Sequence, residues 1–560
     1  SSGAAPSPDQ INHLLEHYQA DRLVEFEALA TSLTQQFPKH PVGWKALGIA
    51  LKQTGRLAES LVPMQSAVAL SPQDADAHSN LGNTLKALGR LDESEASYRQ
   101  ATALKPDFAE AHNNLGAILR ELGRLEEAEA SYRQAVALKP DFAEAHNNLG
   151  NTFKELGRLD EAILSYQRSL DLGLSDADAP EAQAQLIHQR CHICDFSVFD
   201  GLSATAQRLG ISTARVPPFN ALSWADDPEQ HLLRAQVYVR ETFKWPAQTL
   251  PVRRGERPER LKIGYFSADF HDFAGMYLMA GLLESHDRDR FEVYAFSYGP
   301  DKDDAMRRRI VAAVDHFIDI REMSTQEAVD LSREHGIDIA LHRNGHTQGS
   351  RTELFQHRLA PVQISYLGYP ETLGADFIDY LVADPVVIPE EERQYYNEKI
   401  IYLPDTYQPN DNTRQIAETN TTRADFGLPE EGFVLCCFNQ NYKISPQEFD
   451  IWMRVLGQVE GSVLWLLKSN RWAEENLKKE AEHRGIDPSR VIFAEKIPHA
   501  EHLARHKHAD LFVDTFNYNA HTTASDALWS GLPIVTKQGR QFAARVAASL
   551  LTAVGLPELI

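Results

Sequence analysis

Apolar and small residues recur with a period of 34 residues along the first third of the chain. Each period carries a leucine–glycine pair, a glycine–arginine pair and a proline at fixed offsets. The leucine–glycine pairs begin at Leu47, Leu81, Leu115 and Leu149, the glycine–arginine pairs at Gly55, Gly89, Gly123 and Gly157, and the prolines are Pro38, Pro72, Pro106 and Pro140. The pattern predicts two antiparallel helices per period, with small residues where the helices cross and glycine at the turn.

This period is typical of the tetratricopeptide repeat, whose units stack into a superhelix because each leaves an apolar face that only its neighbours cover. We assign residues 7–185 to the array, with residues 7–40 as a degenerate first repeat. Asn80, Asn114 and Asn148 hold one position in successive repeats. Because asparagine has a lower helix propensity than alanine, this ladder indicates either a binding role for its amides or a recent duplication of one repeat.

The period is lost after residue 185, where helical segments alternate with prolines such as Pro246 and Pro251. We assign residues 186–259 to a helical connector. From residue 260 onward, short apolar runs alternate with helical patterns, which predicts βαβ units. The expected strands are 262–266, 291–297, 337–341, 361–366 and 380–383 in one lobe, and 432–438, 462–467, 491–494, 510–514 and 533–536 in the next. Two Rossmann-like lobes, residues 260–425 and 426–560, would bind ligands beyond the carboxyl ends of their strands.

Composition narrows the class of partner. The formal net charge of −23 argues against nucleic acid or an anionic membrane surface. The sequence has no apolar run of about 18 residues, and its first residues lack the regions of a secretory signal. Cys191 and Cys194 form a single C-x-x-C pair, and Cys436 and Cys437 lie in an apolar run. We therefore expect a reducing cytoplasm, without a disulfide framework or a zinc site.

The stretch from His508 to Trp529 predicts a buried strand, a loop and a helix that begins near Thr522. A strand-to-helix junction presents free backbone N–H groups and the positive end of the helix dipole, which suits a bound phosphate. Threonine hydroxyls can add hydrogen bonds, and Asp526 can accept from ribose hydroxyls. The alternative is a capping box, Thr523-x-x-Asp526, that only begins a helix.

Two further segments favour the phosphate interpretation, namely Cys437-Phe-Asn-Gln-Asn-Tyr-Lys443 and Pro498-His-Ala-Glu-His-Leu-Ala-Arg505. With the His521 region they resemble the C-terminal lobe of O-linked N-acetylglucosamine transferases and related bacterial SPINDLY-like proteins. The resemblance covers nearly the whole chain, repeats included. It implies a repeat superhelix followed by a GT-B fold of two Rossmann-like lobes, whose C-terminal lobe is incomplete at Ile560.

The resemblance also implies roles for individual residues. Lys443 is expected to contact the donor diphosphate, with Gln440 in the same site. The other matched positions are His521, Thr522 and Thr523 in the phosphate-binding turn, Asp526 at the ribose, His502 and Arg505 at the uridine, and Leu367, Gly368, Tyr369 and Pro370 beside the sugar and acceptor. His499 stands where some members have a ribose-binding lysine. Asn80, Asn114 and Asn148 would bind the backbone of an extended substrate polypeptide.

The expected proton acceptor is where the sequence departs from the family. The family pattern Asp-Phe-x-x-His reads here Asp269-Phe-His-Asp-Phe273, and phenylalanine cannot accept a proton. We therefore expect Asp269 to handle the proton, directly or through water. Glu371 replaces a family glycine and would add a carboxylate beside the diphosphate sugar, which is electrostatically unfavourable.

These observations favour an inverting protein O-glycosyltransferase that moves N-acetylglucosamine from UDP to serine or threonine of polypeptides. No metal or other cofactor is expected, because the Asp-x-Asp sequences at Asp74 and Asp176 lie at repeat boundaries and are typical of helix caps. Two alternatives stay open. One is the same fold with GDP-fucose as donor, as in a SPINDLY-like fucosyltransferase. The other is a repeat-based scaffold with a decayed transferase part, which Phe273 favours and the retained Lys443 opposes.

Overall fold

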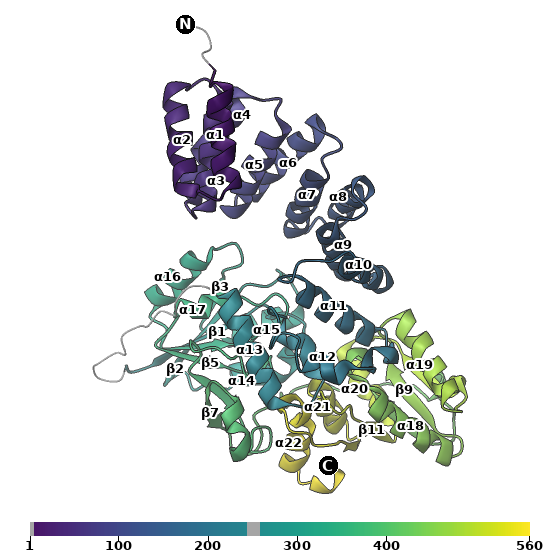
Figure 1. The fold of residues 1–560 in the computed structure, drawn as a ribbon. Coiled ribbons are helices and arrows are strands. Elements are labelled where there is room, and N and C mark those ends of the chain that lie inside the picture. Colours follow the sequence, from purple (N-terminus) through teal and green to yellow (C-terminus); the bar gives the residue numbers. More distant parts are fainter. Residues whose placement is uncertain (1–4, 244–257) are drawn as a thin grey trace. The chain divides into compact units, whose positions relative to one another are not determined.

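The computed structural model describes residues 5–243 and 258–560, and the chain divides into two compact units, Ser1–Ser175 and Asp176–Ile560. Part of the predicted connector, with Pro246 and Pro251, lies outside the described residues. The first unit is a series of helix pairs (Figure 1). Its helices are α1 (Pro8–Gln19), α2 (Leu23–Gln36), α3 (Pro41–Gln53), α4 (Leu57–Leu70), α5 (Ala75–Ala87), α6 (Leu91–Leu104), α7 (Ala109–Glu121), α8 (Leu125–Leu138), α9 (Ala143–Glu155) and α10 (Leu159–Asp171). The predicted repeat array is confirmed.

From α3 onward, each pair of helices packs a glycine against a large side chain. A Cβ added at Gly116 in α7 would lie 2.8 Å from the Tyr132 ring of α8, so only glycine allows this approach. The turn that follows α7 needs a glycine for another reason, because Gly123 has a φ of +74°. Asp74 caps α5 by accepting from the backbone N–H of Ala77, as predicted.

The arginine that follows the turn glycine joins neighbouring repeats at three positions, Arg56, Arg124 and Arg158. The Arg124 guanidinium donates to Glu127 in its own helix and to Glu95 in the preceding repeat, the latter at 2.8 Å. Arg158 repeats this arrangement with Glu161 and with Glu129, at 2.7 and 2.6 Å. Exposed ion pairs contribute little singly, but these recur at three of the junctions, whereas Arg90 bonds, among the described residues, only Glu93 in its own helix.

The second unit begins with helices of which α11 packs on the second lobe and α13 on the first. They are α11 (Ala179–His192), η1 (Phe196–Phe199), α12 (Leu202–Ala206), η2 (Pro218–Ser223) and α13 (Pro228–Thr242). The rings of His188 and His192 in α11 pack against Tyr442, with centroids 5.2 and 4.9 Å away. Asn470 and Asn476 donate to the backbone at the end of α11. The end of α11 is thereby fixed beside the loop that contains Lys443.

The first lobe is a seven-stranded parallel sheet in the order β3-β2-β1-β4-β5-β6-β7. Its strands are β1 (Leu261–Ser267), β2 (Phe291–Ser297), β3 (His316–Asp319), β4 (Ile339–His342), β5 (Val362–Ser365), β6 (Tyr380–Ala383) and β7 (Lys399–Tyr402). The helices are α14 (Met276–Glu284), α15 (Ala305–Ala313), α16 (Thr325–His335), α17 (Glu353–Gln356) and η3 (Glu390–Tyr395). The edge strands β3 and β7 were absent from the sequence prediction.

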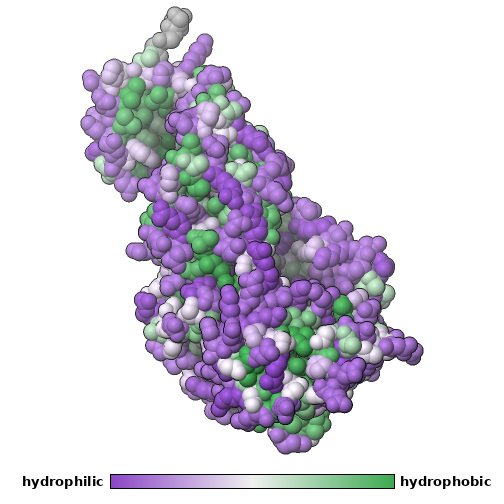
Figure 2. Space-filling model, turned by 90° about the vertical axis from the view of Figure 1, so that its right-hand side faces the viewer, coloured by the Kyte–Doolittle hydropathy of each residue, from purple (hydrophilic) through white to green (hydrophobic). Residues whose placement is uncertain are grey.

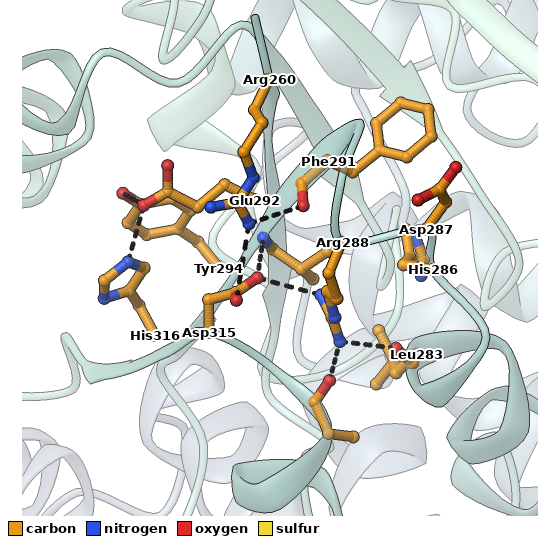
Figure 3. A network of polar contacts seen from close by, with 12 residues as sticks. Arg260, Leu283, His286, Asp287, Arg288, Phe291, Glu292, Tyr294, Asp315 and His316 are labelled. Atoms are coloured by element: carbon orange, nitrogen blue, oxygen red, sulfur yellow. Dashed lines mark hydrogen bonds and ion pairs between the residues drawn. The ribbon is translucent and has the colours of Figure 1, made fainter.

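A polar network ties the amino ends of the strands of this lobe to each other. Asp315, just before β3, accepts from the backbone N–H of Val293 at 2.7 Å and from Arg288 at 3.0 Å (Figure 3). Arg260 forms a longer ion pair with Asp315, 3.6 Å, and donates to the carbonyl of Phe291. This network lies at the opposite end of the strands from the carboxyl ends where ligands bind, so we assign it a structural role.

The second lobe is a five-stranded parallel sheet in the order β10-β9-β8-β11-β12. Its strands are β8 (Val434–Cys437), β9 (Val463–Leu467), β10 (Val491–Ala494), β11 (Leu511–Val513) and β12 (Ile534–Val535). The helices are η4 (Ala424–Phe426), η5 (Asn441–Lys443), α18 (Pro446–Gln458), α19 (Arg471–His483), η6 (Pro488–Arg490), α20 (His499–Arg505), η7 (His506–His508), α21 (Thr522–Trp529), η8 (Phe542–Ala544), α22 (Val546–Ala553) and η9 (Pro557–Leu559). The predicted α/β class with two parallel sheets is confirmed.

Apolar cores lie on both sheets, and the four cysteines are free and buried. Figure 2 shows hydrophilic side chains over most of the face that it presents, with exposed hydrophobic side chains in separate groups. In the described part of the chain, no helix combines the length and the apolar character needed to cross a membrane.

Candidate functional site

The loops that follow β8 and β11 meet because these two strands are neighbours in the sheet. Asn439, after β8, donates through Nδ2 to Asp514 at 3.1 Å and to Thr515 at 2.8 Å, both after β11. Thr523, in the first turn of α21, donates to Oδ1 of the same asparagine. Asn439 therefore holds together the three pieces of backbone that surround the predicted phosphate position.

Lys443 lies at the centre of this group. Its ammonium nitrogen donates to the carbonyl of Asn519 at 3.0 Å and lies 3.7 Å from the centroid of the Tyr518 ring. Burial lowers the pKa of Lys443 to about 8, and the nearby Asp514 opposes this shift. Gln440, predicted in the same site, is exposed at the start of η5.

The helix α21 begins as a phosphate site would require. His521 is the N-cap residue, and no side chain caps the first turn. The capping box between Thr523 and Asp526 is therefore absent, because Thr523 bonds Asn439 and Asp526 pairs with Arg414. The first-turn N–H groups and the helix dipole are left for an anion. The His521 ring contacts the carbonyl of Ala543 at 3.1 Å, and burial lowers its pKa well below the usual range.

The two predicted uridine residues pack on one aromatic ring. The Arg505 guanidinium lies 4.7 Å from the Phe438 centroid, and the His502 ring lies 5.3 Å from it. Arg505 is 2% exposed and donates to the carbonyl of Glu495 at 2.6 Å. Burial lowers the pKa of His502 and keeps its ring neutral at ordinary pH.

His499 and Asp526 lie side by side where a ribose is predicted. The His499 ring stacks on Tyr277 from α14 of the first lobe, with centroids 3.7 Å apart and planes 17° apart. Asp526 is 4% exposed and pairs with Arg414 at 2.7 Å. Both lobes and the segment between them therefore reach this part of the site.

The predicted sugar segment is a rigid turn after β5. Leu367 has a φ of +120°, a strained conformation for a residue with a side chain. The N–H of Gly368 donates to the carbonyl of Arg343 at 2.9 Å, and a Cβ there would lie 2.3 Å from that oxygen. Tyr369 and Pro370 are buried behind the turn.

Asp269 is held after β1 by two donors on one oxygen. The buried Arg343 and the amide of Asn344 both donate to Oδ2, the latter at 2.8 Å. No described residue donates to Oδ1, which is left to accept a proton from a ligand or a water molecule. Phe273, at the family's histidine position, is 46% exposed.

Glu371 does not carry the charge expected from its sequence. Its side chain is fully buried, and this burial raises its pKa to about 8, so the carboxyl is mainly neutral at pH 7. Burial also raises the pKa of the adjacent Glu398, which accepts from Thr372 and Leu373. A neutral Glu371 would not repel the negative charge of a diphosphate sugar, which was the effect expected from the sequence.

The asparagine ladder differs from one repeat to the next. Asn148 donates to Asn113 at 3.1 Å, whereas the partly exposed side chains of Asn80 and Asn114 make no hydrogen bond to other described residues. Sequence reasoning missed Asn113, which in turn donates to Glu144. In the site it also missed Tyr518, Tyr277 and Arg414, because nothing local marks a linker arginine or a first-lobe tyrosine as part of a second-lobe site.

Comparisons with known proteins were made on sequence and on structure. The profile described as Glycosyl transferase family 41 matches residues 230–419 and 411–560, and tetratricopeptide-repeat profiles match residues 82–119, 116–157 and 143–172. The probable UDP-N-acetylglucosamine–peptide N-acetylglucosaminyltransferase SEC of Arabidopsis thaliana is 36% identical over 356 residues, which cover 61% of this chain and 36% of the relative. The corresponding Caenorhabditis elegans enzyme is 28% identical over 440 residues, covering 58% and 38%.

Among solved structures, a mutant of the Thermobaculum terrenum O-GlcNAc transferase superposes with a TM-score of 0.61 at 27% identity. The superposition covers 87% of this chain and 86% of that one. By contrast, the chain spans little more than a third of the length of the two curated relatives that it matches.

Proposed function

We propose that this chain, which belongs to glycosyl transferase family 41, transfers N-acetylglucosamine from UDP to serine or threonine hydroxyls of polypeptides, with inversion and without a metal ion. The observation that carries the proposal is the placement of Lys443 beside the uncapped first turn of α21, at the carboxyl ends of β8 and β11. The names of the curated relatives support the donor and the acceptor class.

The reaction needs a stabilised leaving group. The acceptor oxygen forms a bond to C1 of the sugar while the bond from C1 to the diphosphate oxygen breaks. Negative charge then gathers on the diphosphate, where the Lys443 ammonium and the N–H groups of Thr522 and Thr523 stabilise it. A lysine and a helix amino terminus thus supply the positive charge that a metal ion supplies in other transferases.

The hydroxyl proton must leave as the new bond forms. We assign it to Oδ1 of Asp269, directly or through one water molecule, because Arg343 and Asn344 already occupy Oδ2. Those two donors hold the carboxylate in one orientation. Polypeptide acceptors would bind the repeat unit through amides such as those of Asn80 and Asn114. The four unpaired, buried cysteines fit a reducing compartment.

The test is nucleotide-dependent thermal stabilisation followed by a transfer assay, comparing wild type with Lys443→Ala and Lys443→Met. UDP at 100 times its dissociation constant should stabilise the wild type by about 2.7 kcal/mol. Both variants should lose most of this stabilisation and all transfer. Lys468→Ala is the matched control, because Lys468 is an exposed lysine of the same lobe and is paired with Glu495.

The outcomes separate the alternatives. Stabilisation by GDP and GDP-fucose in place of UDP would identify the other donor. Absence of any nucleotide effect in the wild type would leave the repeat-based scaffold as the function. Transfer that persists in Lys443→Ala would exclude Lys443 as the group that stabilises the leaving diphosphate.

A further inference from the structure

The segment that joins the two sheets, residues 403–423 between β7 and η4, is called the linker below, and it packs directly on α21. Gln408 donates through Nε2 to the Ser525 hydroxyl at 2.6 Å and to the carbonyl of His521 at 3.3 Å. Farther along, Arg414 donates through Nη1 to Oδ1 of Asp526 at 2.7 Å. Two residues of the linker therefore contact α21 within one helical turn of its start.

Arg414 is held firmly in this position. Its Nε donates to the carbonyl of Asp411 at 3.3 Å, and its guanidinium lies 5.3 Å from the Trp529 ring. The Asp411 carboxylate is paired with Arg309 of α15 at 2.6 Å. A continuous chain of polar contacts thus runs from the first lobe, through the linker, to Asp526.

Two buried nitrogen atoms beside this ion pair make no hydrogen bond to a described residue. Nη2 of Arg414 makes no hydrogen bond to a described residue, and water cannot easily reach it because the side chain is only 2% exposed. Nε2 of His499 is also buried without a hydrogen bond to a described residue, and it lies 3.9 Å from Oδ1 of Asp526. No described donor reaches Oδ2 of Asp526. Because a buried donor without an acceptor is costly, this arrangement indicates a ligand that supplies hydroxyl groups.

We propose that Arg414 is a further nucleotide-binding residue, which orients the Asp526 carboxylate and donates from Nη2 to a ribose hydroxyl. That hydroxyl donates its own proton to Oδ2 of Asp526, so one ribose oxygen satisfies both groups. The inference rests on the proposed nucleotide-sugar function. It makes the linker between the lobes a determinant of selectivity for ribonucleotides over 2′-deoxyribonucleotides.

The test is calorimetric binding of UDP, 2′-deoxyuridine diphosphate and inorganic pyrophosphate to the full chain. We expect the wild type to prefer UDP over its deoxy form. Arg414→Met should weaken UDP binding about tenfold or more, the loss typical of one charge-assisted hydrogen bond. It should also bring the ratio between the two nucleotides close to one and leave pyrophosphate affinity unchanged, because pyrophosphate contacts only the lysine and the start of α21.

Two further variants make the result specific. Arg414→Lys keeps a charge beside Asp526 but loses the second nitrogen, so it should fold normally and still lose selectivity between UDP and its deoxy form. Arg423→Met removes another linker arginine. Arg423 forms an ion pair with Asp510 at 2.9 Å and not with a residue of α21, so this variant should preserve selectivity.

Unchanged selectivity in both Arg414 variants would overturn the inference while the proposed function stands. An equal loss of UDP and pyrophosphate affinity in both variants would overturn it as well, since that pattern means a general disturbance of α21. Failure of the wild type to bind UDP at all would overturn the proposed function, and the inference with it.

Discussion

The ammonium nitrogen of Lys443 lies 3.7 Å from the centre of the Tyr518 ring, on a loop that follows a different strand. Tyr518 is itself packed against Tyr442, whose ring contacts His188 and His192 of α11. The lysine is therefore held by a cation–π contact and one carbonyl, and no carboxylate of the described residues is in direct contact with it. Its charge is available to an incoming diphosphate, and burial makes that charge easy to lose as the pH rises.

The first prediction is that UDP affinity falls as pH rises through about 8. The pKa of Lys443 is lowered to about 8 from its usual 10.5, so the free protein holds the charged form below that pH and loses it above. Calorimetric titration between about pH 7 and about pH 8.5 measures the change, in a window where the terminal phosphate is mainly doubly ionised and the uracil ring is mainly neutral. Lys443→Arg stays charged throughout and should give a flat profile. A flat wild-type profile would contradict the assignment.

The second prediction concerns Glu371, whose pKa is raised to about 8 from 4.5 by burial. A carboxyl with a raised folded pKa stabilises the fold at low pH and loses that contribution as pH rises toward the folded pKa. The contribution of Glu371 to the unfolding free energy should therefore decline from about pH 5 to about pH 8, by up to a few kcal/mol.

Glu371→Gln keeps a neutral side chain of the same size and should flatten this decline, which leaves the variant more stable than wild type near pH 8. Melting temperatures across the pH range measure the difference. Glu475→Gln in α19 is the control, since Glu475 is exposed. A parallel decline in wild type and Glu371→Gln would show that the carboxyl ionises normally.

The third prediction is that Phe273→His raises the turnover number in the transfer assay. Phe273 is 46% exposed, so the change should alter the unfolding free energy by no more than about 0.5 kcal/mol. A histidine there would restore a proton acceptor beside Asp269. Phe273→Leu is the control and should not raise turnover. An unchanged kcat in Phe273→His would mean that the proton leaves through Asp269 alone.

Local pattern was sufficient for most of the fold. The strands β2, β6 and β10 begin and end where the apolar runs do, and the repeat helices follow the period of 34 residues. The strands that escaped prediction, β3 and β7, lie at the two edges of the first sheet, and none of their residues is fully buried. An edge strand is partly in water, so it need not carry the apolar run by which a buried strand is recognised.

The residues of the candidate site also fall into those that the local sequence predicts and those that it does not. Lys443, Thr522 and Thr523 were predicted because each sits in a short segment directly after a strand, where sequence neighbours are also neighbours in space. Arg414 could not be predicted, because its partner Asp526 lies more than a hundred residues away and the linker around it is merely polar. The capping box failed for the same reason, since Asn439 from another strand takes the Thr523 hydroxyl.

The sequence by itself determined the repeat array, the two parallel sheets and the strand-to-helix junction at which α21 begins, because periodicity and strand-end motifs act over short distances along the chain. Only the tertiary structure decided the charge of Glu371, the pairing of Arg414 with Asp526 and the contact of Lys443 with Tyr518. Each of these depends on burial or on a partner distant in sequence, and burial changes the free energy of a charge in a way that no local pattern records.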